Sequence, residues 1–339
     1  MRSVPRTGSL RAFGRFIPLG ALLFLFSLHT AAAGEMTSTF MIGGARIDVT
    51  MDGGKCEASQ AELMRWVKSA AESVTAYYSR FPVPHLSLQI KCFDGSGVRH
   101  GQTFGRDGGL ITINAGNKTP PAELADDWML THEMVHLAFP SMERNHHWIE
   151  EGISVYVEPI ARIRAGHWTA RQMWMDLVRD MPKGLPKEGD EGLDNTHTWG
   201  RTYWGGALFC FVADVEIRRR SNNKKGLEDA LRGILNAGGD IREDWRLEDA
   251  LKAGDKATGV DVLLKQYENM KDQPVNVDLP ALWKELGVES DADGIHFKVD
   301  APLAAVRRSI TDGVAAMSPG AEAAARPLTI FAGRTAGHS

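Results

Sequence analysis

The stretch His132-Glu133-Met134-Val135-His136 constrains the fold of this chain more than any other five residues. The apolar periodicity around it predicts a helix, and residues four apart share one face of a helix. Two imidazoles on that face can bind one metal ion, while the glutamate lies beside the metal without ligating it. The fold must therefore surround this helix with further polar groups.

A catalytic zinc ion needs a third protein ligand and leaves one coordination position open for water. Downstream lies Trp148-Ile149-Glu150-Glu151-Gly152, next to a helix predicted over residues 150–163. A glutamate there could complete a set of two histidines and one carboxylate. The residues alone leave several candidates for this third ligand, namely Glu151, Glu150, His146 and His147.

Trp-x-x-Glu-Gly, a short distance after His-Glu-x-x-His, resembles the gluzincin metallopeptidases, which include the aminopeptidase-N-like and glycyl-aminopeptidase families. The resemblance implies that His132, His136 and Glu151 bind Zn²⁺, because the family's glutamate ligand directly precedes the glycine. It implies that Glu133 is the general base that activates water for attack on a peptide bond. It also implies a zincin-like α+β domain, with a small N-terminal lobe that contains strands and a larger, mostly helical C-terminal lobe.

A second match to these families lies at Thr202-Tyr203-Trp204-Gly205-Gly206, which opens a helix predicted over residues 201–220. In the gluzincins, a tyrosine three residues before a glycine is taken to stabilise the oxyanion of the tetrahedral intermediate. This role maps onto Tyr203, and a phenol that donates a hydrogen bond to developing negative charge is an effective catalytic group. The alternative is an aromatic side chain that packs at the start of a helix.

Two departures limit what the resemblance implies. The Gly-x-Met-Glu-Asn motif, which grips the free amine of the substrate in the aminopeptidase-N family, does not occur. In its region, residues 108–114 are expected to form an edge strand that could hydrogen-bond an extended peptide. No aspartate stands four residues after Glu150 or Glu151, so a carboxylate that supports a ligand histidine must come from elsewhere. Asp126 and Asp127 are expected to be helix-start charges.

The N-terminus predicts export. Four arginines within the first 15 residues precede an apolar run over residues 16–28 and a small-residue site at 31–33, a pattern typical of a secretory signal peptide. An uncleaved anchor is the alternative, but the apolar run is short for a membrane span. We expect a periplasmic or extracellular protein with no stable membrane insertion. Cleavage would leave 35 basic against 43 acidic residues, which argues against nucleic acid as a partner.

Three cysteines bear on the same compartment. An oxidising compartment permits one disulfide, and Cys56 and Cys92 flank the first predicted helix, residues 57–79, so we expect these two to pair. Cys210 lies in an apolar helical stretch and is expected to be a buried thiol.

The order of predicted elements, a few strands followed by a run of helices, also favours an α+β fold. We expect strands over 40–51, 86–93 and 110–113, a loop over 95–109 and one helix over 122–139. The predicted parts are a signal peptide (1–33), an N-terminal α+β part (34–121), a helical zinc-peptidase part (122–290) and a partly disordered C-terminal segment (291–339).

These patterns together predict an exported metallopeptidase with one Zn²⁺ per chain and a peptide or protein as its substrate. The main alternative is a catalytically silent exported protein that binds a peptide or an envelope component on the same fold. Retention of Glu133 disfavours it, because a structural zinc site uses four protein ligands and needs no base. A third reading is hydrolysis of a non-peptide bond by the same site. Imidazole and carboxylate ligands also suit cobalt or manganese.

Overall fold

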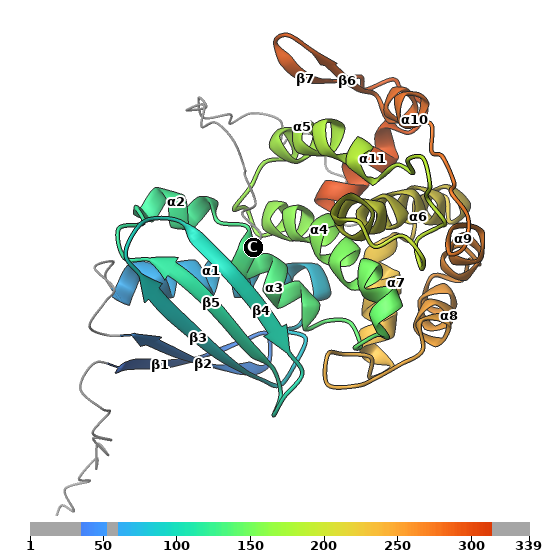
Figure 1. The fold of residues 1–339 in the computed structure, drawn as a ribbon. Helices are drawn as coiled ribbons and strands as arrows, with labels where there is room; N and C mark the ends of the chain where they lie inside the picture. The colour runs from blue at the N-terminus through green and yellow to red at the C-terminus, as the bar shows by residue number, and fades with distance from the viewer. Residues whose placement is uncertain (1–34, 53–59, 314–339) are drawn as a thin grey trace, which may run out of the picture. The chain divides into compact units, whose positions relative to one another are not determined.

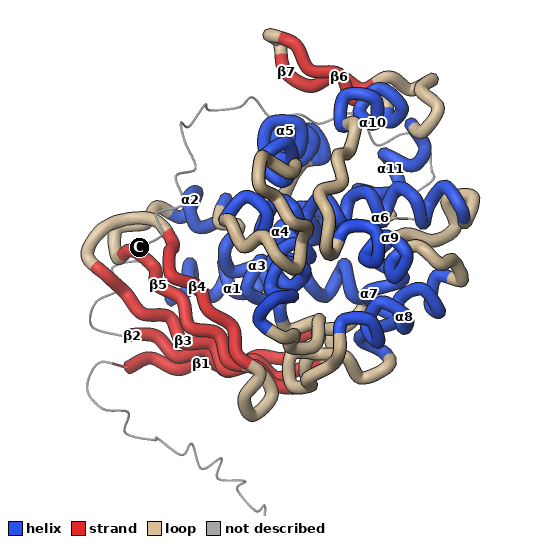
Figure 2. Tube along the Cα trace, turned by 45° about the vertical axis from the view of Figure 1, so that its right-hand side comes forward, coloured by secondary structure: helices blue, strands red, loops and turns tan. Residues whose placement is uncertain are grey.

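The computed structural model describes residues 35–52 and 60–313. In this part a five-stranded sheet comes first and a group of helices follows, which confirms the α+β class (Figures 1 and 2). None of the described helices is both long and apolar enough to span a membrane. The predicted signal peptide, Cys56 and the end of the chain after Gly313 lie outside the described residues.

The sheet has the strand order β1-β2-β3-β5-β4. Its strands are β1 (Glu35–Ile42), β2 (Ala45–Asp52), β3 (His85–Phe93), β4 (Val98–Phe104) and β5 (Leu110–Gly116). The three inner strands β2, β3 and β5 run parallel, and both edge strands are antiparallel to their neighbours. One strand with a turn was expected over residues 40–51, but the chain forms a hairpin because Gly43 and Gly44 both adopt positive φ.

The edge strand β4 lies where the sequence predicted a loop over residues 95–109. None of its seven side chains is fully buried, so the strand shows no apolar alternation. The prediction of an edge strand over residues 108–114 is also wrong. Those residues lead into β5, and β4 covers the side of β5 that would otherwise be the edge.

One face of the sheet forms the core of this lobe. Leu86, Leu88 and Ile90 of β3 are buried, while the residues between them are polar. Helix α1 (Gln60–Tyr78) lies along the buried face and presents nine buried residues to the core (Figure 1). The alternation on β3 is therefore that of a strand with one face in the core.

The helix predicted over residues 122–139 is two helices, α2 (Pro121–Asp126) and α3 (Met129–His136). Between them, the Asp127 carboxylate accepts hydrogen bonds from the backbone N–H groups of Met129 at 3.2 Å and Leu130 at 3.0 Å. These bonds satisfy N–H groups that have no partner within the helix, so α3 begins anew at this point. Asp127 is thus a helix-start residue, as expected.

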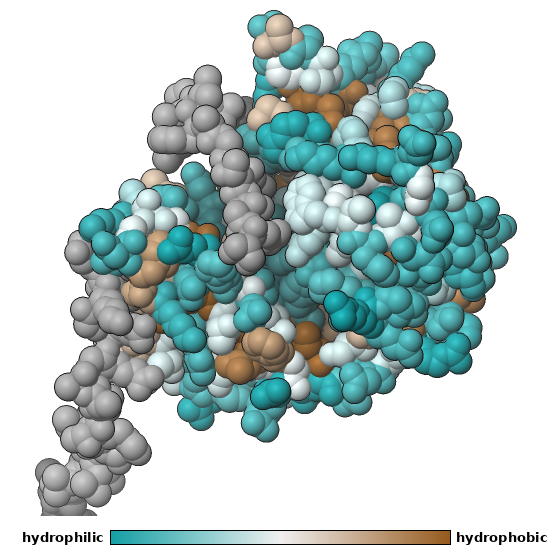
Figure 3. Space-filling model, in the orientation of Figure 1, coloured by the Kyte–Doolittle hydropathy of each residue, from teal (hydrophilic) through white to brown (hydrophobic). Residues whose placement is uncertain are grey.

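The helical part follows α3. Its longer elements are α4 (His147–Arg164), α5 (Ala170–Asp180), the π-helical turn η3 (Gly200–Gly205), α6 (Gly206–Arg220), α7 (Leu227–Asn236), α8 (Leu247–Thr258), α9 (Leu263–Met270), α10 (Leu279–Leu286) and α11 (Ala304–Asp312). A hairpin of β6 (Val288–Asp291) and β7 (Gly294–Phe297) packs on α5. Figure 3 shows hydrophobic residues gathered where the hairpin meets α5, at the top of the view.

Helix α3 lies between the two parts of the fold (Figures 1 and 2). It contacts the edge strand β4 and helix α1 on one side and α4 on the other. Polar residues on α3 are therefore enclosed by elements from both parts.

Candidate metal centre

The two motif histidines lie on one face of α3, as their spacing predicts. Nε2 of His136 lies 3.3 Å from Nε2 of His132, and the two rings are nearly perpendicular, at 81°. His132 is 5% exposed, and the side chain of His136 is 13% exposed. Two ring nitrogens that meet in a buried place need a proton or a metal ion between their lone pairs.

Glu151 on α4 completes a group of three. Its Oε2 lies 3.1 Å from Nε2 of His132 and 3.7 Å from Nε2 of His136. We call His132, His136 and Glu151 the metal group, since their ligand atoms all lie within 4.8 Å of one another. Ligands about 2.1 Å from a tetrahedral zinc ion are separated by roughly 3.4 Å, so the observed spacings fit one metal ion.

Two rival candidates for the third ligand point elsewhere. Glu150 accepts a hydrogen bond from the backbone N–H of Met142 at 3.2 Å. Nε2 of His146 lies 3.1 Å from the hydroxyl of Tyr267 and 3.4 Å from the carboxylate of Asp194. Both side chains are therefore engaged in the contacts that tie the start of α4 to its surroundings.

The last rival, His147, lies beside Glu151. Its Nε2 is 3.2 Å from Oε1 of Glu151, and its Nδ1 is 3.2 Å from Oε2 of Glu150. Hydrogen bonds to Glu150 and Glu151 raise the pKa of His147 to about 10. His147 therefore faces the oxygen of Glu151 that is turned away from the motif histidines.

A pair of glycines brings the helices of the site together. A β-carbon on Gly152 would overlap the backbone of Gly206, and one on Gly206 would overlap the carbonyl oxygen of Trp148. Rotation of a side chain cannot relieve a clash between a β-carbon and backbone. The glycine after Glu151 therefore allows the close approach of α4 to the segment that carries Tyr203.

Glu133 is 7% exposed, and strand β4 holds its carboxylate. The hydroxyl of Thr103 donates a hydrogen bond to Oε2 of Glu133 at 2.6 Å. A β-carbon at Gly101 would lie 2.5 Å from Oε1 of Glu133, so a larger residue there would displace this carboxylate from its observed position. Burial raises the pKa of Glu133, although the charge of His132 opposes this effect. A raised pKa suits a carboxylate that must both take and return a proton.

Tyr203 lies on the π-helical turn η3, a kind of turn often found at functional sites. Burial raises the pKa of Tyr203, and the negative charges of Glu151 and Glu133 raise it further. The phenol therefore stays protonated and lies within electrostatic reach of both carboxylates. Trp199 stacks on its ring, with the ring centroids 5.8 Å apart.

A buried ion pair anchors the turn that carries Tyr203. Nε of Arg201 lies 2.7 Å from Oδ2 of Asp190, and Nη1 of Arg201 donates to the carbonyl oxygen of Gly184 at 2.6 Å. The two charged side chains are only 4% and 2% exposed. Arg201 thereby ties the turn η3 to the segment that follows α5, which contains Gly184 and Asp190.

The ionisation states of Glu151 and His136 favour metal binding. Burial opposes ionisation of Glu151, but the charge of His136 and the hydrogen bond from His132 outweigh it and lower its pKa. Burial lowers the pKa of His136 to about 4. Burial also acts to lower the pKa of His132, but the hydrogen bond with Glu151 outweighs it and raises that pKa. At neutral pH, Glu151 is thus ionised and His136 neutral, the forms that ligate a metal.

The carboxylate expected behind a ligand histidine is not found at Nδ1 of His132. This nitrogen is buried and has no hydrogen-bond partner among the described residues. Asp127 is occupied at the start of α3. Glu158, which lies further along α4 than Glu151, pairs instead with Arg162 at 3.0 Å.

Three residues that shape the site were not predicted: Thr103, Gly101 and Arg201. Thr103 and Gly101 lie on β4, whose place in the sheet depends on pairing with β5 rather than on its own pattern. Arg201 stands directly before the matched segment 202–206. A charged residue at the start of an apolar helix could have signalled a buried ion pair.

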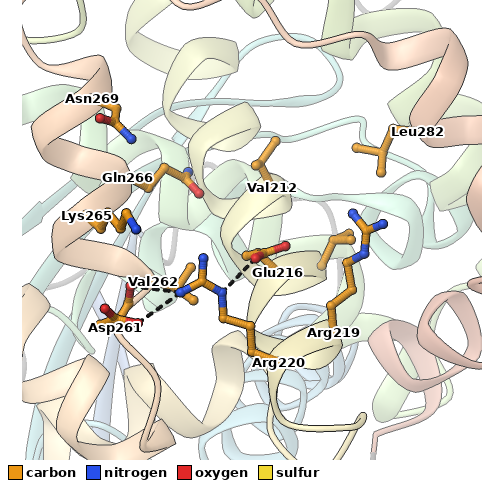
Figure 4. A pocket seen from close by; sticks show the side chains of 11 residues that line it. Val212, Glu216, Arg219, Arg220, Asp261, Val262, Lys265, Gln266, Asn269 and Leu282 are labelled. Atoms are coloured by element: carbon orange, nitrogen blue, oxygen red, sulfur yellow. Dashed lines mark hydrogen bonds and ion pairs between the residues drawn. The ribbon is translucent and has the colours of Figure 1, made fainter.

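A separate hollow of about 290 Å³ lies between α6, α9 and α10 (Figure 4). Three of its charged residues pair with one another, since Arg220 lies 2.7 Å from Glu216 and 2.9 Å from Asp261. No residue of the metal group lines it. We therefore assign the hollow no part in the chemistry.

Comparison with solved structures finds proteins of similar fold. Structural superposition with an aminopeptidase N family protein from Idiomarina loihiensis covers 79% of this chain and 53% of that one, with a TM-score of 0.56 and 12% sequence identity. For an M1 zinc metallopeptidase from Deinococcus radiodurans, the coverage is 73% and 53%, the TM-score 0.47 and the identity 13%.

The chain spans about half the length of these two proteins. No protein-family model matches it, and no curated protein matches it in sequence. At 12% identity, the likeness to the Idiomarina protein shows the fold alone. The described residues therefore have a peptidase-like α+β fold, with the metal group where its sheet and helical parts meet.

Proposed function

We propose that this chain is a zinc-dependent metallopeptidase in which His132, His136 and Glu151 hold one Zn²⁺. The convergence of three ligand atoms, at separations of 3.1, 3.3 and 3.7 Å, carries the proposal. The peptidase-like fold supports it. Zinc bound there would lower the pKa of a water molecule and polarise the carbonyl group of the scissile bond.

Two further residues carry the proposed mechanism. Glu133 takes a proton from the attacking water and passes it to the nitrogen of the leaving amine. Thr103 holds Oε2 of this carboxylate, which orients Oε1 for the transfer. Tyr203 donates a hydrogen bond from its phenol to the carbonyl oxygen as that oxygen gains negative charge.

The proposed substrate is a peptide bond in a peptide or protein. Strand β4 is the edge of the sheet next to Glu133, and an extended peptide can pair with an exposed edge of this kind. Residues 98–104 include no acidic side chain that could bind a free α-amine. We therefore propose that cleavage does not require a free N-terminus.

We further propose that the protein acts in the periplasm or outside the cell, without stable membrane insertion and without a nucleic-acid partner. The basic and apolar N-terminal sequence supports export. Cys92 is disulfide-bonded, which suits an oxidising compartment. Cys210 is a buried free thiol, as expected. Mass spectrometry of the exported protein should find Gly34 at its N-terminus, and an intact N-terminus would contradict cleavage after residue 33.

A peptide cleavage assay tests the activity. The metal-depleted protein is incubated with internally quenched peptides, each with a free or an acetylated N-terminus, before and after one equivalent of Zn²⁺ is added. We expect cleavage only after zinc is added, and with both kinds of N-terminus. If a zinc-loaded protein cleaves no peptide, the peptidase proposal fails and the silent binding protein becomes the better account.

A further inference from the structure

His147 makes two contacts that the metal group does not need in order to bind a metal ion. Its ring lies between two carboxylates, with Nε2 3.2 Å from Oε1 of Glu151 and Nδ1 3.2 Å from Oε2 of Glu150. Ionised carboxylates only accept hydrogen bonds. Each ring nitrogen of His147 therefore faces an oxygen that can accept a hydrogen bond.

The two oxygens of Glu151 face different partners. Oε2 lies toward His132 and His136, at 3.1 and 3.7 Å, whereas Oε1 lies toward His147. A hydrogen bond to one oxygen of a ligand carboxylate orients that carboxylate and leaves the other oxygen for the metal. Binding through one oxygen keeps the fourth position of a tetrahedral site open.

A chain of contacts fixes His147 in its turn. Oε2 of Glu150 faces Nδ1 of His147, while Oε1 of Glu150 accepts a hydrogen bond from the backbone N–H of Met142 at 3.2 Å. Met142 lies in the segment between α3 and α4, the two helices that carry the metal group. The contacts therefore run from this connecting segment through Glu150 and His147 to Glu151.

We propose that His147 is a positioning residue that holds Oε1 of Glu151, so that Glu151 binds the metal through Oε2 alone. The proposal rests on the proposed zinc site and assigns His147 a role distinct from that of a ligand. Only about half of the His147 side chain is covered, at 52% exposure, so it can be replaced without opening a cavity in the core.

Zinc affinity is the readout that separates positioning from ligation. The dissociation constant for Zn²⁺ is measured by competition with a chromophoric chelator for the full chain and its variants. In His147→Ala we expect one zinc per chain at saturation, with a dissociation constant raised by about 10- to 100-fold. In His147→Gln the side-chain amide can still donate to Oε1, so part of the affinity returns.

A matched control comes from another half-exposed histidine. Nε2 of His296 lies 3.0 Å from Asp291, and its side chain is 47% exposed. His296→Ala should therefore keep the affinity of the parent. With Co²⁺ in place of zinc, the visible absorption spectrum should change in His147→Ala and return toward that of the parent in His147→Gln.

Two results would overturn the role of His147. An unchanged affinity and spectrum in His147→Ala would show that it does not orient Glu151. Loss of zinc stoichiometry in both His147 variants would make it a ligand. With either result, the parent should still bind one zinc ion and Glu151→Ala should still bind none. A parent that binds no zinc removes the proposed function and the role of His147 together, so the two failures are distinguishable.

Discussion

In the described part of the chain, the metal group can be compared with a second cluster of buried charged side chains, and the two are completed in different ways. In the arginine cluster (Arg164, Asp214, Arg218 and Glu228) each carboxylate faces a guanidinium. Arg218 lies 2.8 Å from Asp214 and 2.7 Å from Glu228, and Arg164 lies 3.2 Å from Glu228. The metal group instead combines a carboxylate with two imidazoles, beside the second buried carboxylate of Glu133.

The comparison shows that buried charge does not by itself mark a functional site. The arginine cluster supplies its own cations, and such networks occur within ordinary cores. The metal group contains no arginine or lysine, and a bound metal ion would supply the cation that faces Glu151.

Glu133→Gln should give the largest effect, because it preserves shape and removes the proposed base. We expect kcat/KM for a quenched peptide to fall by about 10³-fold, within the range for loss of a general acid–base group, with zinc content unchanged. Kinetics and elemental analysis on one preparation check this. Loss of zinc together with activity would place Glu133 among the ligands instead.

Arg218→Met should break the arginine cluster and spare the metal group. Asp214 and Glu228 would be left without this cation in a buried place, which costs about 3–5 kcal/mol of the free energy of unfolding. Urea unfolding measures it, with Arg219→Met in an exposed pair with Glu285 as the control. Equal stability of the two variants, or weaker zinc binding by folded Arg218→Met, would contradict the distinction.

Tyr203→Phe should lower kcat without affecting metal binding. Removal of one hydrogen-bond donor to an oxyanion costs about 10²- to 10³-fold in kcat, while KM and zinc affinity stay near those of the parent. Steady-state kinetics with zinc-saturated protein give the result. An unchanged kcat would leave Tyr203 as a packed aromatic residue.

Gly152→Ala should push α4 away from Gly206. The new β-carbon would meet backbone, and overpacking of this kind costs about 1–3 kcal/mol of the free energy of unfolding. Because α4 carries Glu151, zinc affinity should fall too. Ser154→Ala on the same helix is the control, since its buried hydroxyl has no hydrogen-bond partner among the described residues. Equal zinc affinity in both variants would show that this contact does not position Glu151.

Through His136, acid should gradually lower the free energy of unfolding of the metal-free protein. Burial lowers the pKa of His136 from 6.5 to about 4, so in that range the unfolded chain binds a proton that the folded chain excludes. This contribution to stability is present above pH 6.5 and lost as the pH falls through 4, by at most about 1.4 kcal/mol per pH unit. Urea unfolding from pH 7 to pH 4 should show a smaller slope for His136→Gln. Equal slopes would contradict the lowered pKa.

Patterns of nearby residues correctly predicted the helix α1 and the shared face of His132 and His136. Helical spacing brings His132 and His136 to one face of α3, and the apolar stripe of α1 predicts that helix within three residues at either end. The buried thiol at Cys210 followed from the apolar helical stretch around it. These features depend on residues a few positions apart.

Contacts distant in sequence escaped prediction. Strand β4 is defined by its pairing with β5, and its exposed side chains give no pattern, so Thr103 and Gly101 could not be placed beside Glu133. The break before α3 arises from bonds to the side chain of Asp127, while apolar residues continue across it. The close approach of Gly152 to Gly206 likewise follows from helix packing.

The zinc content of the protein decides whether His132, His136 and Glu151 bind a metal ion. It is measured by elemental analysis after reconstitution with Zn²⁺ in the parent, Glu133→Gln, Glu150→Ala and Glu151→Ala. We predict about one zinc per chain in the first three and none in Glu151→Ala. Retention of zinc in Glu151→Ala with loss in Glu150→Ala would move the ligand to the neighbouring residue. Absence of zinc from the parent would contradict the account of the metal group as a whole.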